Sequence, residues 1–182
     1  MKKALLIASV LFIAVISTAC INNIAVQELN NKAAEYMQKG DYEAAVNRLQ
    51  ASIDLDSSMY ETYYNLGIAA TNAKKYDVAI EAFNNGIKIK PDFANFYYSL
   101  AIAQAEYADS LEELIDNAKK EEIENNKKKI VELNISAIEN AKKYLELAPQ
   151  AEDREEVDDF IDGLKVQDND DVKKEPQVLL KG

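Results

Sequence analysis

Apolar side chains along the middle of the chain follow two spacings at once. Over short stretches they fall three or four residues apart, which places them on one face of an α-helix. Over longer distances similar side chains return after about 34 residues, so the pattern predicts a repeated unit built from two amphipathic helices. The pairs that carry the repeat are Tyr42 and Tyr76, Ala45 and Ala79, Val46 and Ile80, Leu49 and Phe83, Ile53 and Ile87, and Leu55 and Ile89.

The period divides the middle of the chain into three predicted units. Residues 26–59 form the first, residues 60–93 the second, and residues 94–150 the third. Leu100 and Ala137 of the third unit occupy the same motif positions as Leu66 and Ala79 of the second. The chain between the two positions is much longer in the third unit than in the second. The third unit therefore carries 24 extra residues, at about 108–131.

The extra residues contain no Gly or Pro, and apolar stripes lie on either side of a polar stretch at 119–129. We therefore predict that both helices of the third unit lengthen into a projecting antiparallel hairpin. Its turn is expected at Asn125-Asn126, and a fresh helix could begin at Ser110, which has capping-box spacing to Glu113. A disordered loop is the alternative. Residues 151–165 predict a capping helix, and the polar, acidic residues 166–182 predict a disordered tail.

Residues 60–93 resemble the tetratricopeptide repeat (TPR), with Tyr63 in place of its preferred Trp. Small residues in this motif let the two helices approach, an aromatic ring fills the space between units, and a proline ends the second helix. Residues 26–59 resemble the motif less closely, with Lys32 and Ser57 departing from it. The resemblance implies an all-α fold, a right-handed α-solenoid of about three TPR hairpins and a capping helix over residues 26–165. The expected repeat-packing residues are Tyr63, Leu66, Gly67, Ala79, Phe83 and Pro91.

TPR proteins bind peptides or partner domains in a concave groove lined by the first helix of each unit. By the family's pattern, the positions that line the groove in this chain include Asn30, Asn31, Ala34 and Ser99. Tyrosine and isoleucine would hold a partner segment while an amide bonds its backbone. The alternative is that the tyrosines pack against neighbouring units. No cation occupies these places, which argues against an acidic C-terminal tail as ligand. The predicted partner-binding groove comprises Tyr64, Asn65, Ile68, Tyr98 and Ile102.

The first twenty residues have the order of a signal peptide: a basic start, an apolar run at 4–16 and small residues before Cys20. The apolar run is short for a transmembrane helix. The small residue before the lone Cys20 resembles the lipobox of bacterial lipoproteins, although Ser17 stands where Leu is usual. This resemblance implies removal of residues 1–19, diacylglycerol and palmitate-type acylation at Cys20, and a lipidated tether at 20–25. Ordinary secretion with a free cysteine and an uncleaved anchor are the alternatives.

The predicted location follows from the lipobox and from Ile21, which stands where an inner-membrane retention signal would have Asp. The resemblance implies an outer-membrane protein facing the periplasm in a Gram-negative host. In other hosts it implies the outer face of the plasma membrane.

Composition narrows the chemistry. The chain has no histidine and one cysteine, so His-based catalysis and Cys or His metal sites are excluded. Its net charge is −11, which disfavours nucleic-acid binding. We expect no catalytic residues, no metal and no cofactor. The predicted function is a membrane-anchored scaffold or adaptor for proteins of the bacterial cell envelope. A structural, self-associating envelope protein is the alternative, and an enzyme using paired carboxylates is disfavoured.

Overall fold

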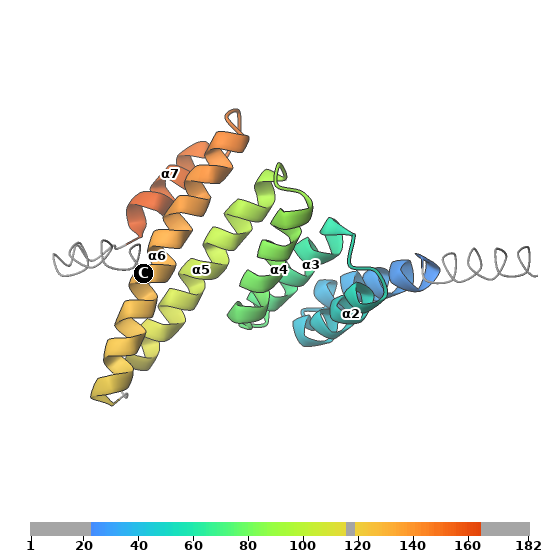
Figure 1. Ribbon diagram of the computed structural model, residues 1–182, viewed down its shortest axis with the longest axis horizontal. Helices are drawn as coiled ribbons and strands as arrows, with labels where there is room; N and C mark the ends of the chain where they lie inside the picture. The colour runs from blue at the N-terminus through green and yellow to red at the C-terminus, as the bar shows by residue number, and fades with distance from the viewer. Residues whose placement is uncertain (1–22, 116–118, 165–182) are drawn as a thin grey trace, which may run out of the picture.

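A computed structural model describes residues 23–115 and 119–164, and this part of the chain is built from helices without any strand. Figure 1 shows the helices following one another side by side along the molecule. The all-α class predicted from the sequence is confirmed. In order, the elements are the helical residues 23–38, α2 (Tyr42–Leu55), α3 (Tyr60–Asn72), α4 (Tyr76–Ile89), α5 (Ala94–Ile115), α6 (Lys120–Leu147) and α7 (Arg154–Gly163).

The turns inside the first two units repeat with the same period as the sequence. Gly40 has a φ of +74°, and Lys74, at the equivalent place of the next unit, has a φ of +57°. The backbone N–H of Asp41 donates to the carbonyl of Tyr36 at 2.9 Å, and the N–H of Lys75 donates to the carbonyl of Ala70 at 2.8 Å. A left-handed residue satisfies the last carbonyls of the first helix and reverses the chain within three residues. The unit is thus repeated at the level of single hydrogen bonds.

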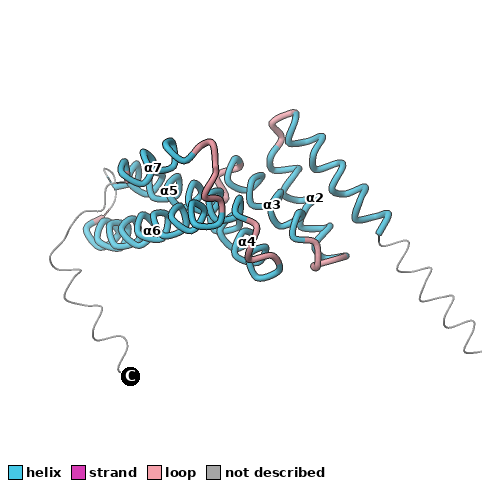
Figure 2. Tube along the Cα trace, turned by 90° about the horizontal axis from the view of Figure 1, so that it is seen from above, coloured by secondary structure: helices cyan, strands magenta, loops and turns pink. Residues whose placement is uncertain are grey.

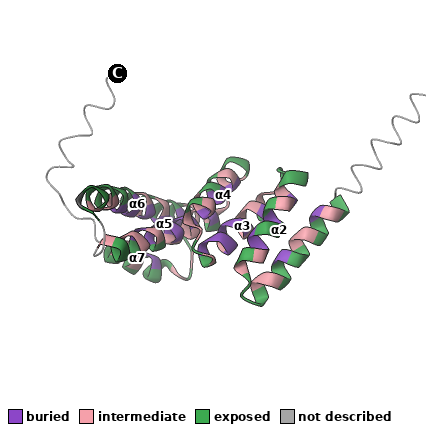
Figure 3. Cartoon of the chain, turned by 90° about the horizontal axis from the view of Figure 1, so that it is seen from below, coloured by how far each residue is buried: buried purple, intermediate pink, exposed green. Residues whose placement is uncertain are grey.

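The main core lies where the inward faces of successive helices meet, and Figure 3 shows the buried residues gathered on those faces. Leu49 of α2 and Phe83 of α4, one repeat apart, are both fully buried. Many of the surrounding core residues are alanine, whose small side chain allows short distances between the axes of packed helices. In Figure 2 the same helices stand beside one another in a layered array.

Two glycines allow aromatic rings to lie directly against a helix backbone. A Cβ added at Gly67 of α3 would overlap the ring of Phe83, and one added at Gly86 of α4 would overlap the ring of Phe96. Gly67 was expected from the sequence as a packing residue, whereas Gly86 was not. Each glycine therefore defines the contact between two neighbouring helices.

The last hairpin is longer than those before it. Helix α5 has 22 residues against 13 in α3, and α6 has 28 against 14 in α4, so helices hold 23 of the 24 extra residues. In Figure 1 the paired ends of α5 and α6 extend past the end of α4. The nine added residues of α5 correspond to about two and a half turns.

Two predicted details of this hairpin are wrong. The turn does not lie at Asn125-Asn126, because α6 begins at Lys120 and runs through both. Acidic residues in its first turn favour this start, and the Glu122 carboxylate accepts a hydrogen bond from the Lys119 backbone N–H at 3.0 Å. No fresh helix begins at Ser110: α5 is continuous there, and the Ser110 hydroxyl donates to the Tyr107 carbonyl at 2.7 Å.

Helix α7 covers the end of the array by packing on α6. Val157 is its fully buried residue and lies in a cluster with Ala101, Ala137 and Ala141. The predicted signal peptide, Cys20 and the predicted tail at 166–182 lie outside the described residues.

Candidate partner-binding site

A solvent-open hollow of about 270 Å³ lies between the first helical segment and α3. Side chains from two consecutive units line this hollow together. Amides predominate in its lining, with one carboxylate, one hydroxyl and one thioether. The residues are Gln27, Asn30, Asn31, Met59, Glu61, Thr62 and Asn65.

The amides differ in how they are held. Asn30 Nδ2 donates to the Val26 carbonyl and to Ser52 Oγ, both at 2.9 Å, so both of its N–H bonds are used and its carbonyl oxygen is left as an acceptor. Among the described residues, the side chains of Asn31 and Asn65 have no hydrogen-bond partner. The hollow thus presents both donors and acceptors.

Thr62 is the most unusual residue of this lining. The residue is 1% exposed, and its hydroxyl is the one buried side-chain polar atom in the described residues that has no hydrogen-bond partner. A buried hydroxyl without a partner costs about 1–3 kcal/mol. Thr62 was not expected from the sequence, although the period offers a signal: its equivalent one repeat later is Phe96, an apolar residue at a buried position.

Tyr64, a predicted groove residue, is half-buried among aromatic rings. Its ring centroid lies 6.1 Å from that of Phe83, 5.4 Å from Phe93 and 5.5 Å from Phe96. The Ser99 hydroxyl lies 3.4 Å from the Tyr64 hydroxyl. Tyr64 therefore joins three helices.

Tyr98 occupies the equivalent place in the third unit. Its ring stacks on Tyr144 of α6 at 5.1 Å between centroids and meets the edge of Phe160 of α7 at 6.2 Å. Burial, together with the nearby carboxylates of Glu156 and Asp153, raises the pKa of Tyr98 above its ordinary value. Helix α7 thus shields part of this ring.

The remaining groove residues divide in the same way. Ile68 is half-buried against the main core, and Ile102 is half-buried. Asn65 meets Asn30 and Asn31 in the hollow, whereas Tyr64 and Tyr98 lie in aromatic packing between helices. Contact of the predicted groove residues with a partner stays a prediction.

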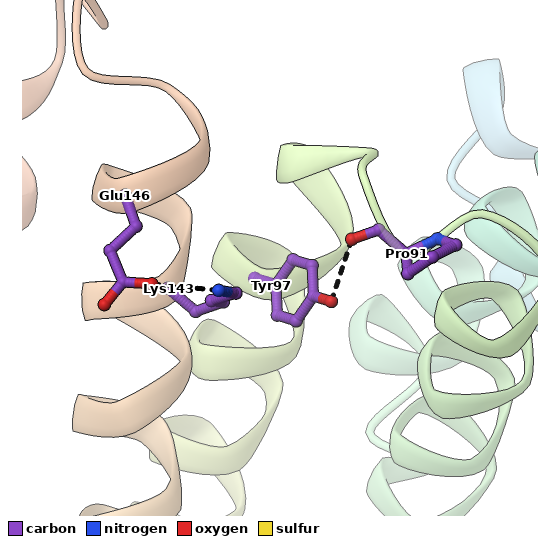
Figure 4. A network of polar contacts seen from close by, with 4 residues as sticks. All are labelled: Pro91, Tyr97, Lys143 and Glu146. Atoms are coloured by element: carbon purple, nitrogen blue, oxygen red, sulfur yellow. Dashed lines mark hydrogen bonds and ion pairs between the residues drawn. The ribbon is translucent and has the colours of Figure 1, made fainter.

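Four of the six expected repeat-packing residues are buried in the structure. Leu66, Gly67, Ala79 and Phe83 are buried, Tyr63 is half-buried, and Pro91 is exposed just after the end of α4. Figure 4 shows Tyr97, at the Trp place of the third unit, donating a hydrogen bond from its hydroxyl to the Pro91 carbonyl at 2.9 Å. In the same view Lys143 and Glu146 form an ion pair at 2.9 Å on α6.

The described residues were compared with the requirements of a metal site and of a membrane-spanning helix. Within residues 23–115 and 119–164, no group of three or more Asp, Glu, His or Cys side chains is placed to hold a metal ion. None of the helices in the same ranges has both the length and the apolar character that crossing a membrane requires.

A family model for the TPR repeat matches residues 33–70 and 71–106. Comparison with curated proteins found no match. Among solved structures, the TPR2B domain of yeast Sti1, from its complex with an Hsp70 peptide, is 18% identical, with a TM-score of 0.58, covering 76% of this chain and 94% of that one.

Two further structures are similar to a comparable degree. The second TPR domain of human RPAP3, in complex with the HSP70 peptide SGPTIEEVD, is 14% identical, with a TM-score of 0.58, covering 78% of this chain and 98% of that one. The type III secretion translocator chaperone SycD of Yersinia enterocolitica is 20% identical, with a TM-score of 0.55, covering 82% of this chain and 94% of that one. At these identities the likeness concerns the fold. The described part of the chain is therefore an all-helical array that carries TPR repeats over residues 33–106.

Proposed function

We propose that this protein is a scaffold that binds an extended segment of a partner protein in the amide-lined hollow. TPR repeats typically serve protein–protein interaction rather than catalysis, which supports the general function. The observation that carries the particular site is the Thr62 hydroxyl, buried without a partner in the wall of a hollow that also holds the amides of Asn31 and Asn65. A peptide backbone offers alternating N–H and C=O groups, which amides and hydroxyls complement.

The charge of the hollow favours a ligand without a terminal carboxylate cluster. Glu61 is the charged residue of the lining, which includes no Lys or Arg. The HSP70 peptide bound by the human RPAP3 domain ends in EEVD. Such a tail would bring its carboxylates towards Glu61, so the ligand proposed here is an uncharged or basic segment.

The test separates the effect of the Thr62 hydroxyl on stability from its effect on partner binding. Thr62→Val keeps the shape of the side chain but removes the hydroxyl. We expect this variant to raise the free energy of unfolding of the isolated protein by about 1 kcal/mol, because it removes an unpaired polar group from the interior. We expect the same variant to weaken partner binding, because the hydroxyl then has no bond to offer.

Binding is measured in the producing cell with a photo-crosslinking amino acid at the exposed position Asn31, and with one at the exposed Asn125 of α6 as a matched control. Adducts should form from Asn31, not from Asn125, and should decline in the Thr62→Val and Asn65→Ala backgrounds. Equal adducts from both positions, or adducts unchanged by both substitutions, would contradict the site.

We further propose that the scaffold is anchored to the cell envelope by lipid on Cys20. The proposed organisation is a signal peptide at 1–19, a tether at 20–25, a TPR domain at 26–165 and an acidic tail at 166–182. Only two residues separate Cys20 from the first described helical residue, Asn23. An anchor at Cys20 would hold the hollow near the membrane surface.

The anchor is tested by Cys20→Ser. The unsubstituted protein should enter the detergent phase on phase partitioning and incorporate labelled fatty acid, because acyl chains supply stable membrane attachment. The serine variant should do neither. Label that persists in the serine variant would refute lipidation at Cys20 without affecting the proposal for the hollow.

A further inference from the structure

A second hollow, of about 400 Å³, lies on a different side of α3 from the amide-lined one. Helices α2 and α4 both pack against α3, and the space between them remains open above the α3 surface. The two hollows share no residue. The lining consists of Gln50, Ile53 and Asp54 from α2, Tyr63 and Leu66 from α3, and Val78, Glu81, Ala82 and Asn85 from α4.

This hollow combines an apolar floor with charged walls. Leu66 and Ala82 are buried, and Ile53, Tyr63 and Val78 are half-buried around them. The carboxylates of Asp54 and Glu81 are contributed by α2 and α4, the two walls, and both residues are exposed.

Neither wall carboxylate has a cationic partner within the described residues, where the ion pairs are Lys32–Glu35, Lys75–Glu43 and Lys143–Glu146. One cation contacts a residue of the lining: Lys88 Nζ donates to the Asn85 side-chain oxygen at 3.0 Å. Glu81 lies one helical turn before Asn85 on α4, and Lys88 lies beyond both.

We propose that this hollow is a second docking surface, and that it takes a partner segment presenting an arginine side chain beside an apolar one. The guanidinium would lie between Asp54 and Glu81, and its methylene stem would cover the apolar floor. Arginine fits better than lysine because its planar, weakly hydrated head can also stack on the half-buried ring of Tyr63. The excess of acidic residues in the chain attracts basic partners over longer range.

This surface is independent of the proposed function, because it shares no residue with the amide-lined hollow. The probe is the tripeptide acetyl-Leu-Arg-Leu-amide, titrated into the ¹⁵N-labelled full chain while backbone amide shifts are followed by NMR. The control probe carries citrulline in place of arginine, which keeps the shape and removes the charge. Shifts should concentrate in α2 and α4 with the arginine probe, and binding should weaken as salt is added.

The decisive variant is Asp54→Asn combined with Glu81→Gln, which removes both charges and keeps both shapes. We expect about tenfold weaker binding of the arginine probe, as two exposed ion pairs would contribute. The matched control, Glu152→Gln with Asp162→Asn, removes two exposed carboxylates elsewhere and should bind as the unsubstituted protein does. Circular dichroism confirms that both variants fold. Equal binding of the citrulline probe, unchanged binding by the Asp54/Glu81 variant, or shifts confined to residues 23–38 would overturn the proposal.

Discussion

At the scale of single residues, small side chains decide which helices can touch. The ring of Phe83 lies against Gly67, and the ring of Phe96 lies against Gly86, where any Cβ would overlap it. Ser52 stands one repeat before Gly86, is also fully buried, and accepts the hydrogen bond from Asn30. This place of the repeat therefore accepts a small residue in both units, and in the first unit it supports the amide-lined hollow.

The Gly67 contact gives a prediction for stability. Gly67→Ala should lower the free energy of unfolding by about 1–2 kcal/mol. The added methyl forces the Phe83 ring to move, and the free-energy cost of that movement exceeds the gain in helix propensity from alanine. Urea denaturation followed by circular dichroism measures the change.

Gly163→Ala is the matched control, since a Cβ there meets no atom within 4 Å. It should cause no loss of stability. Combining Gly67→Ala with Phe83→Leu should cost less than the sum of the two single changes, because both act on one contact. A Gly67→Ala protein as stable as the Gly163→Ala control would show that the ring moves freely.

At the scale of elements, α7 is held to the array by part-buried polar contacts as well as by apolar packing. The Tyr144 hydroxyl of α6 lies 2.7 Å from Asp153 Oδ1 and 3.0 Å from Oδ2, just before α7 begins. Arg154 Nη2 donates to the Leu145 carbonyl at 3.3 Å. Burial, together with this hydrogen bond and the charge of Asp153, raises the pKa of Tyr144 to about 12.

The raised pKa predicts that the cap weakens in alkali. The pKa of an unfolded tyrosine is about 10, so between pH 10 and 12 the unfolded state loses this proton first and becomes favoured. The stabilisation by Tyr144 is fully present below pH 10 and declines as the pH rises to 12. Tyr144→Phe should lower the free energy of unfolding by about 1 kcal/mol at pH 8. That deficit should vanish as the pH approaches 12.

The measurement compares urea denaturation of the two proteins from pH 8 to 12. The other tyrosines are present in both, so the difference between the two curves isolates Tyr144. A constant difference in the free energy of unfolding across this range would mean that ionisation of the Tyr144 hydroxyl does not weaken the packing of α7.

The elements also show where local signals mislead. Asn125-Asn126 has turn-forming side chains, yet α6 passes through it, since its neighbours at Ile130 and Leu133 are buried against Ala108 of α5. Ser110 and Glu113 have the spacing of a cap, yet α5 passes through them as well. Packing along two long helices outweighs weak local preferences for a turn.

At the scale of the whole molecule, the two hollows described above lie on different sides of α3. One is lined by amides from the first helices of two units, and the other combines an apolar floor with carboxylates from α2 and α4. One repeat array can therefore offer separate surfaces to separate segments. This arrangement suits a scaffold, since occupation of one hollow leaves the residues of the other uncovered.

The sequence by itself determined the helical class, the TPR repeats and the acidic, histidine-free chemistry. These properties depend on composition, on the short helical spacing and on the longer repeat period, which are visible without coordinates. Only the tertiary structure decided that Tyr64 and Tyr98 pack between helices, that Thr62 is buried without a partner, and that α5 and α6 continue through apparent turns. Those outcomes depend on contacts between residues of different helices, and helical periodicity names the face of a side chain but not the neighbour that covers it.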